Sequence, residues 1–303
     1  METILVTGGY GLVGRALKSD KYNLIHLNSS ICDLRNFSDT LEIFKLVNPD
    51  YVIHLAACVG GLYKNMNNPV KMLEDNVLIN TNVLHCAHIV KVKKLIACLS
   101  TCIFPNNTSY PINETMLQNG PPHESNEGYA YAKRLLETQC KTYNKEYNCN
   151  YICVIPTNIY GSFDNFNLED SHVIPGLIHR CYLAKKTQTK FIVKGTGKPL
   201  RQFIYSIDVA KLIMRILDSD VIGGSYILSP TEEYSILDIA NMIMDSFDYH
   251  DILFDDSFSD GQYRKTADNS KLKKLVDFEF TDLNTGIKNT IDWFIKNYNT
   301  VRK

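Results

Sequence analysis

The chain has 303 residues, of which 45% are hydrophobic and 21% are charged, and its formal net charge is −1. At roughly 150 residues per domain, this length predicts about two domains, or one large α/β domain with an appendage. The near-neutral charge argues against a nucleic-acid binder, and the lack of an apolar run of about 18 residues argues against a membrane protein. The first residues have no basic stretch before a long apolar run, so we expect no signal peptide and a cytoplasmic location.

Short apolar runs alternate with helix-length segments in the first half of the chain. The predicted strands are Thr3–Thr7, Asn23–Leu27, Tyr51–Leu55, Lys94–Leu99 and Tyr151–Ile155. The predicted helices between them are Leu12–Ser19, Phe37–Val47, Val70–Val90 and Gly128–Tyr147. The strands are continuous in Ile, Leu and Val, as expected when both faces are covered. This pattern predicts an α/β fold of the Rossmann type with a doubly wound parallel sheet.

After Gly161 this alternation becomes irregular. The predicted helices are His172–Ala184, Ser206–Leu217, Ser235–Phe247 and Asp282–Tyr298, with Ser235 and Asp282 as N-caps. We expect residues 1–160 to form a dinucleotide-binding domain and residues 161–303 a smaller, irregular substrate lobe. A segment near residues 200–230 is expected to return to the first domain.

The nine cysteines lie between positions 32 and 181, and no Cys-x-x-Cys pair occurs among them. Cys98 and Cys102 have no second pair of ligands, so we expect no metal site. Most of the cysteines lie in apolar runs such as Tyr151–Ile155, which is typical of buried thiols in a reducing compartment.

A glycine-rich loop follows the first predicted strand and opens the first predicted helix. Gly8, Gly11 and Gly14 have the spacing G-x-x-G-x-x-G. Such glycines let the backbone approach a pyrophosphate, and a helix N-terminus adds N–H donors and a positive dipole end. The alternative is a glycine turn that serves packing alone. The candidate cofactor-binding residues of this loop are Gly8, Gly9, Tyr10, Gly11, Leu12, Val13 and Gly14.

The residues after the second predicted strand bear on the choice of cofactor. Asn28, Ser29 and Ser30 stand where an NAD-binding Rossmann protein usually has an acidic residue for the ribose hydroxyls. Without that acid, a ribose 2′-phosphate meets no repulsion, which favours NADP(H). Asp33 and Leu34 are placed to reach the adenine, although Asp33 is also a candidate N-cap for the segment from Asn36.

A Tyr-x-x-x-Lys pair, Tyr129 and Lys133, lies on a predicted helix, where residues i and i+4 share one face. A nearby cation lowers the pKa of a tyrosine, so we expect Tyr129 to be a usable acid. Ser100 follows the fourth predicted strand, at the edge of a parallel sheet where ligands bind. Together with the glycine loop, Ser100, Tyr129 and Lys133 resemble the triad of the extended short-chain dehydrogenase/reductase superfamily.

Further blocks narrow this resemblance to the GDP-L-fucose synthase family, over essentially the whole chain. They are Leu99-Ser-Thr-Cys-Ile-Phe-Pro105, His54-Leu-Ala-Ala57, Pro156-Thr-Asn-Ile-Tyr-Gly161, Asp164-Asn-Phe-Asn167, Ser171-His-Val-Ile-Pro175 and Asp260-Gly-Gln-Tyr-Arg-Lys265. The resemblance implies NADPH-dependent conversion of GDP-4-keto-6-deoxy-D-mannose to GDP-L-fucose, by epimerisation at carbons 3 and 5 and then reduction at carbon 4. It also implies a homodimer that pairs Val70–Val90 and Gly128–Tyr147.

The resemblance assigns the remaining roles residue by residue. Ser100 and Tyr129 would hold the 4-keto oxygen, Lys133 the nicotinamide ribose, and Cys102 and His172 would be the base and acid of epimerisation. Further cofactor contacts would be Leu55, Ala56, Ala57, Pro156, Thr157, Asn158, Ile159 and His172. Substrate contacts would be Asn158, Arg180, Lys194, Arg201 and Lys265. Lys194 departs from the family, which usually has tryptophan there.

The chemistry agrees with these types of residue. A ketone at carbon 4 acidifies the hydrogens on carbons 3 and 5, so one base and one acid invert both centres through enolates. Cysteine and histidine ordinarily titrate near neutrality. Structural alternatives stay open: Cys102 as a core residue, His172 as a helix cap and Arg180 as a surface arginine.

Two other functions are alternatives to this one. Another NAD(P)-dependent sugar-nucleotide epimerase or dehydratase is the nearest alternative, but a dehydratase needs an acidic residue where Thr101 and Cys102 stand. A non-catalytic NADP-binding regulator is disfavoured because both Tyr129 and Lys133 are present.

Overall fold

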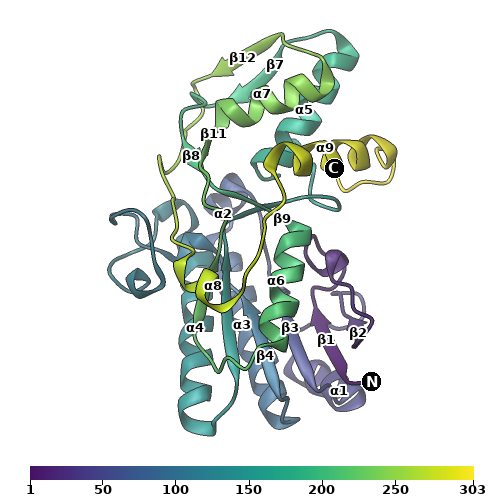
Figure 1. Cartoon of the computed structure of the whole chain (residues 1–303), viewed down its shortest axis with the longest axis vertical. Helices are drawn as coiled ribbons and strands as arrows, with labels where there is room; N and C mark the ends of the chain where they lie inside the picture. Colours follow the sequence, from purple (N-terminus) through teal and green to yellow (C-terminus); the bar gives the residue numbers. More distant parts are fainter.

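The computed structural model describes residues 1–61 and 64–303 and confirms the doubly wound α/β fold (Figure 1). Six parallel strands form the central sheet in the order β10-β5-β4-β3-β1-β2. Their bounds are Thr3–Thr7 (β1), Asn23–His26 (β2), Tyr51–His54 (β3), Lys94–Cys98 (β4), Tyr151–Pro156 (β5) and Ser225–Leu228 (β10). The five strands expected from the sequence are present, and their carboxyl ends meet at one edge.

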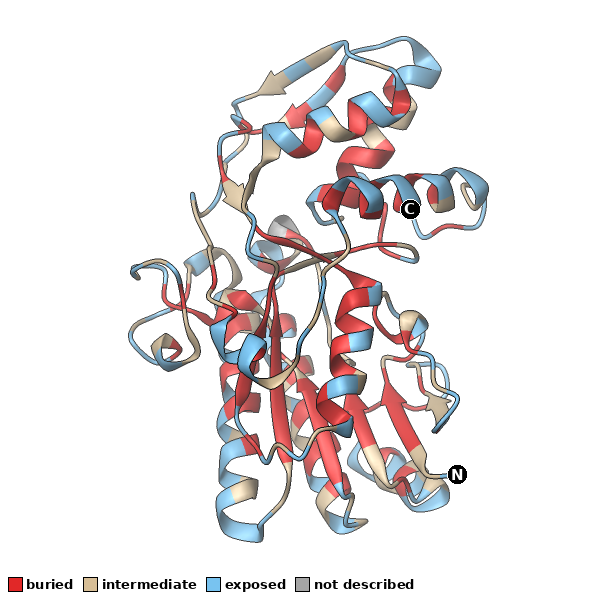
Figure 2. Cartoon of the chain, viewed as in Figure 1, coloured by how far each residue is buried: buried red, intermediate tan, exposed pale blue. Residues whose placement is uncertain are grey.

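Helices cover both faces of this sheet. On one face, α1 (Phe37–Val47), α3 (Pro69–Ile89) and α4 (Glu127–Tyr147) share a core with Leu5, Val52 and Leu95. On the other face, α6 (Ser206–Asp218) packs on Ile4, Ile53 and Ile96. Figure 2 shows the inner strands almost entirely buried, whereas the edge strand β2 is only partly so. Double coverage explains why the strand sequences are apolar without alternation.

The first predicted helix is wrong. Instead of Leu12–Ser19, the chain forms a single 3₁₀ turn at Gly14–Ala16. The chain leaves the helical conformation at Leu17, which is extended, and beyond it the hydroxyl oxygen of Ser19 accepts hydrogen bonds from the backbone N–H groups of Lys21 and Tyr22. A serine that binds nearby backbone in this way competes with helix formation.

A second lobe lies at the other end of the molecule (Figure 1). Its core joins α5 (Val173–Thr187), α7 (Ile236–Phe247) and α9 (Leu283–Lys296) around buried residues such as Phe166 and Ile243. Ser235 caps α7 through a capping box with Asp238, and Asp282 caps α9, as expected.

Short strands and helices complete the structure. The pairs are β7 (Phe191–Lys194) with β12 (Ile252–Asp255), β8 (Leu200–Arg201) with β11 (Tyr234–Ser235), and β6 (Asn158–Tyr160) with β9 (Phe203–Tyr205). The helices are α2 (Leu62–Asn67), α8 (Ser270–Leu275) and the 3₁₀ helices Thr101–Ile103, Glu114–Met116 and Glu124–Asn126. In the part of the chain that the structure describes, no helix has the length and apolarity to span a membrane.

Candidate active site

A cavity of about 1320 Å³ extends from the carboxyl ends of β1, β3, β4 and β5 to the second lobe. Every site residue predicted from the sequence lines it, with one exception, Gly9. The N–H of Gly9 donates to the carbonyl oxygen of Leu27, and its Cα faces the His26 side chain, where a Cβ would lie 2.6 Å from the ring. Gly9 therefore serves the packing of the loop on β2.

The glycine loop is compact in the way that a phosphate cradle requires. Gly8 has φ +68°, and a Cβ on it would lie 2.7 Å from the backbone nitrogen of Ala56. A Cβ on Gly14 would lie 2.5 Å from the carbonyl oxygen of Gly9. Neither position tolerates a side chain, so the loop keeps its backbone at the cavity wall. The glycine loop is followed by a single 3₁₀ turn instead of a long helix. The expected contribution of a helix dipole to pyrophosphate binding is therefore small.

Asp33 is not a helix cap. Asn36 caps α1 by accepting the N–H groups of Ser38 and Asp39. The Asp33 carboxylate lines the cavity and accepts instead from the Arg35 side chain, with N–O distances of 2.7 and 2.9 Å. Arg35 holds the pKa of Asp33 below its usual range.

Ser100, Tyr129 and Lys133 meet where β4 ends. Ser100 caps the 3₁₀ helix Thr101–Ile103 and accepts from the N–H of Cys102 at 3.4 Å. The ammonium of Lys133 donates to the carbonyl oxygen of Cys98 at 2.7 Å and lies 5.9 Å from the centre of the Tyr129 ring. Since α4 carries both Tyr129 and Lys133 on one face, the pair points at the same part of the cavity.

The expectation that Lys133 lowers the pKa of Tyr129 is wrong for this structure. Burial raises the pKa of Tyr129 well above its ordinary value, and the neighbouring thiols of Cys102 and Cys98 add to the rise. Burial also lowers the pKa of Lys133. The phenol is therefore protonated over the whole neutral range, which suits a proton donor.

Cys102 is half-buried and lines the cavity beside Ser100. Burial raises the pKa of its thiol, while the Ser100 hydrogen bond and the cations of Lys265 and Lys133 lower it. The ordinary value used in the sequence argument therefore does not apply. The cations around the thiol are what favour its thiolate form.

The second lobe contributes the opposite wall. His172 precedes the first residue of α5 and is exposed, and Arg180 lies two turns further along the same helix. Arg180 is not a surface arginine: it lines the cavity, its Nε is buried without a protein hydrogen bond, and burial lowers its pKa.

Three further cations line the same side of the cavity as Arg180. We call the four residues the basic wall: Arg180, Lys194, Arg201 and Lys265. Arg201 donates to the carbonyl oxygens of Leu200 and Gln262, at 2.8 and 2.5 Å, and burial lowers its pKa. Burial and the charge of Arg201 lower the pKa of Lys265 to about 8. The ammonium of Lys194 lies 4.5 Å from the centre of the Phe258 ring. Half-buried cations at one end of a cavity suit an anionic ligand.

Comparison with known proteins identifies the family. The NAD dependent epimerase/dehydratase family matches residues 4–228. A GDP-L-fucose synthase of Dictyostelium discoideum is 50% identical, with 100% of this chain and 98% of that protein covered. A probable GDP-L-fucose synthase of Drosophila melanogaster is 46% identical, with both chains covered in full. A crystal structure of a GDP-L-fucose synthetase from Naegleria fowleri bound to NADP is 44% identical, covers 100% of this chain and 95% of that chain, and has a TM-score of 0.93.

The chain belongs to the GDP-L-fucose synthase family.

Two cations of this GDP-L-fucose synthase family member were missed in the sequence argument. Arg15 lines the cavity beside the glycine loop, where it donates to the carbonyl oxygen of Tyr10 at 3.0 Å and lies over the Phe163 ring. Arg35 lines it near Asn28 and Ser29, and pairs with Asp33 and Asp75. Their positions directly after Gly14 and Leu34 were a usable signal, because residues next to a phosphate loop share its surface.

The site also rests on a buried histidine, His54, which stands in one of the family motifs and lies outside the cavity lining. His54 donates from one ring nitrogen to the Asn80 side-chain oxygen (3.0 Å) and accepts with the other from the Thr7 hydroxyl (2.7 Å). Burial lowers its pKa to about 3, so the ring is neutral. These hydrogen bonds link β1, β3 and α3 at the residue that directly precedes Leu55–Ala57.

Proposed function

We propose that the chain catalyses the NADPH-dependent conversion of GDP-4-keto-6-deoxy-D-mannose to GDP-L-fucose. The conversion combines epimerisation at sugar carbons 3 and 5 with reduction of the 4-keto group. The observation that carries this proposal is the convergence of Ser100, Tyr129 and Lys133 with Cys102 and His172 on one cavity, in a chain 50% identical to a GDP-L-fucose synthase.

The cofactor end of the cavity fits NADP(H). The glycine loop, whose Cβ positions at Gly8 and Gly14 are filled by backbone, would take the pyrophosphate, and Arg35 with Asn28 and Ser29 the 2′-phosphate. Asp33 and Leu34 would contact the adenine. The nicotinamide half would lie against Leu55, Ala56, Ala57, Lys133, Pro156, Thr157, Asn158, Ile159 and His172. When bound there, NADPH supplies the hydride that reduces carbon 4.

Three residues act at the ketone. Ser100 donates a hydrogen bond to the 4-keto oxygen, and Tyr129 gives that oxygen its proton as the ketone becomes an alcohol. The high pKa that burial gives Tyr129 keeps the proton available until negative charge develops on the oxygen. Lys133 holds the nicotinamide ribose and places its positive charge 5.9 Å from the centre of the Tyr129 ring.

Epimerisation uses the two walls of the cavity. Cys102, on the sheet side, removes the proton from carbon 3 or 5, and the resulting enolate is stabilised at its oxygen by Ser100 and Tyr129. His172, on the second lobe, returns a proton to the other face. Inversion requires groups on opposite sides of the sugar, and Cys102 and His172 come from opposite walls of the cavity, which supports this assignment.

The GDP moiety is held by the basic wall. Arg180, Arg201 and Lys265 contact the diphosphate and nucleotide, and Lys194 with Asn158 completes the set. Arg180 has an unpaired buried Nε, which favours a ligand acceptor at that position.

The organisation of the chain extends the proposal. Residues 1–160 form the NADP-binding domain, residues 161–303 mainly the substrate lobe, and the segment near 200–230 returns to the first domain. A homodimer would pair α3 and α4, whose exposed apolar residues include Val70, Leu78 and Leu135. We place the protein in the cytoplasm, with no nucleic-acid or membrane partner.

A spectrophotometric assay of the purified protein tests the function. With GDP-4-keto-6-deoxy-D-mannose, we expect one NADPH to be consumed for each substrate molecule. A 4-epimerase or a 4,6-dehydratase would show no net consumption, and a binding protein would show no turnover at all.

A further inference from the structure

Several side chains that line the cavity keep a buried polar atom without a hydrogen-bond partner. In the part of the chain that the structure describes, they are Asn65, Asn126, Asp164 and Arg180. The first three present an oxygen, so each is an acceptor without a donor, and only Arg180 has a role in the proposed function. Most buried polar atoms in proteins are paired, so an unpaired one at a cavity wall points to a bound group.

Asn65 is the acceptor whose position is fixed best. It is only 8% exposed, and its NH2 group donates to the carbonyl oxygens of Gly60 and Gly61, at 2.8 and 3.0 Å. Because the NH2 group faces two carbonyl oxygens, Oδ1 is the atom that lacks a donor. By contrast, Asn126 is only half-buried, and burial raises the pKa of Asp164 to about 6, so that carboxyl can carry its own proton.

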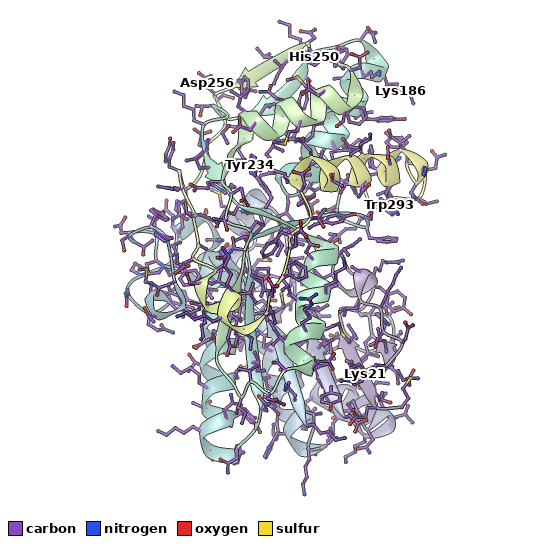
Figure 3. The ribbon with its side chains drawn as sticks, viewed as in Figure 1. Lys21, Lys186, Tyr234, His250, Asp256 and Trp293 are labelled. Atoms are coloured by element: carbon purple, nitrogen blue, oxygen red, sulfur yellow. The ribbon has the colours of Figure 1, made fainter. Side chains whose placement is uncertain are left out.

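Asn65 lies on α2, at the junction of the two lobes (Figure 1). The N–H of Gly61 donates to the carbonyl oxygen of Asp170 at 3.1 Å, and a Cβ on Gly61 would lie 2.9 Å from that oxygen. This close approach brings the segment that Asn65 binds against the chain that leads to His172. Side chains from both lobes fill this region (Figure 3), and on the lobe side the cavity lining extends to the labelled Trp293.

The other end of this segment lies at the sheet. Cys58 follows β3, the neighbour of β4, whose end carries Ser100. The N–H of Cys58 donates to the side-chain oxygen of Asn76 at 2.9 Å, and the NH2 group of Asn76 donates to the carbonyl oxygen of Cys58 at 3.0 Å. The segment from Cys58 to Gly61 therefore runs along the cavity from the sheet to the second lobe. Asn65 binds it where the proposed function places the sugar.

The sugar has few groups that can donate to this oxygen. In GDP-4-keto-6-deoxy-D-mannose, carbon 4 is a ketone and carbon 6 is a methyl group, so the donors that remain are the hydroxyls of carbons 2 and 3. Carbon 3 is inverted during the reaction, and its hydroxyl changes direction. The hydroxyl of carbon 2 keeps its configuration from substrate to product, so a fixed acceptor suits it better.

We propose that Asn65 is a specificity-determining residue of the sugar site, whose Oδ1 atom accepts a hydrogen bond from the hydroxyl on carbon 2. The inference rests on the proposed function, because it names the substrate group that Asn65 binds. The bond anchors the sugar at a carbon that does not react, while the neighbouring carbon loses and regains a proton. It also disfavours sugars that lack this hydroxyl, because the buried acceptor then stays unpaired.

Calorimetric binding of three stable nucleotides to the purified protein tests the proposal. They are GDP, GDP-D-mannose and the 2-deoxy analogue of GDP-D-mannose. We expect the parent protein to bind the 2-deoxy analogue about threefold to tenfold more weakly than GDP-D-mannose, as the loss of one neutral hydrogen bond predicts. Equal affinities for these two sugars would overturn the proposal, and this comparison depends on no variant.

Asn65→Ser removes the acceptor and spares the local fold. A serine in a helix can donate to the carbonyl oxygen four residues earlier, which keeps a bond to Gly61, but it is too short to place an oxygen where Oδ1 lies. We expect this variant to bind GDP as the parent does, to bind GDP-D-mannose about threefold to tenfold more weakly, and to lose the discrimination between the two sugars. Discrimination at the parent level in Asn65→Ser would contradict the proposal. An equal loss of affinity for GDP and GDP-D-mannose would indicate a distorted site and count against it.

The matched control is Asn68→Ser. Asn68 lies at the end of the same helix and donates to the carbonyl oxygen of Lys64 at 3.2 Å, but it is exposed and outside the cavity lining. This variant should have the parent affinities for all three nucleotides. No measurement here uses NADPH or turnover. A failure of the inference therefore leaves the NADPH consumption in the assay above unchanged, whereas a failure of the proposed function abolishes it.

Discussion

The two walls of the cavity are built on different principles. The sheet wall places Ser100, Tyr129 and Lys133 at a strand end and on a long helix, where main-chain hydrogen bonding and a continuous core hold them. The lobe wall takes its groups from a helix start, a short strand and loops, including His172, Arg201 and Lys265.

The walls also differ in charge. The Lys133 ammonium on the sheet wall is satisfied by a carbonyl oxygen at 2.7 Å. On the lobe wall, burial lowers the pKa values of Arg180, Arg201 and Lys265. In the proposed mechanism, reduction uses groups on the sheet wall, whereas substrate capture uses the cations of the lobe wall. Epimerisation is the step assigned to groups from both walls.

The largest expected effect is on the sheet wall. Tyr129→Phe should lower the rate of ketone reduction by about 10²–10⁴-fold, because it removes the proton donor. NADPH binding, measured by fluorescence titration, should be unchanged, since the glycine loop and Lys133 remain. Tyr131→Phe is the control. Tyr131 also lies on α4, but its side chain is 41% exposed, so this variant should keep the parent activity. Parent turnover in Tyr129→Phe would contradict the assignment.

Cys102→Ser separates the two walls, because it affects epimerisation before reduction. Serine is too weakly acidic to act as the base, so deuterium incorporation at carbons 3 and 5 should fall by about 10²–10⁴-fold. Slow reduction of the unepimerised ketone should give a GDP-6-deoxyhexose of the D series, detectable by NMR. Cys58→Ser, a second cavity thiol, should behave as the parent protein does. If Cys102→Ser forms GDP-L-fucose at the parent rate, Cys102 is a packed thiol only.

Arg35→Gln sharpens the account of the cofactor end. Charge-assisted hydrogen bonds contribute about 1.5–3 kcal/mol, so the preference for NADPH over NADH in kcat/KM should fall about tenfold to a hundredfold. Lys71→Gln is a matched control, because Lys71 pairs with Asp75 at 2.6 Å, as Arg35 does at 3.4 Å, but lies outside the cavity lining. An unchanged ratio in Arg35→Gln, or a parent enzyme that prefers NADH, would refute this assignment.

The smallest effect concerns pH and the lobe wall. The pKa of Lys265 is lowered to about 8, so its positive charge is present below that pH and is lost above it. The affinity for GDP, measured by calorimetry, should therefore fall between pH 7 and pH 9, by at most about tenfold for each pH unit. In Lys265→Gln this slope should be reduced, whereas the exposed Lys273→Gln should retain it. A parent slope that persists in Lys265→Gln would place the titration on another group.

The same contrast explains what the sequence could predict. Periodicity and spacing located the residues of the sheet wall. Their signals are local: the glycine spacing, the Tyr129–Lys133 pair and Ser100 after a strand. The first predicted helix is wrong because the chain becomes extended at Leu17 and Ser19 binds the backbone beyond it, which a hydrophobic pattern does not register. Lys265 is far from Cys102 in sequence, and their electrostatic coupling depends on how a late loop folds back.

Burial was the second quantity that sequence reasoning lacked. The Tyr-x-x-x-Lys spacing shows a cation near the Tyr129 phenol, but it does not show the burial that raises the pKa of that phenol. Asp164 lies in a motif that gives it no role in the sequence, because an unpaired carboxylate oxygen is visible only once its surroundings are known. The alternative that Arg180 is a surface arginine stayed open for the same reason.

The central claim is that one cavity performs two inversions and one reduction. It is tested most directly by running the reaction to completion in deuterium oxide with NADPH and GDP-4-keto-6-deoxy-D-mannose, and determining the product by NMR. The account predicts GDP-L-fucose that carries solvent deuterium at both carbon 3 and carbon 5, with one NADPH consumed per product. A D-series sugar, or a product without deuterium at those carbons, would contradict it.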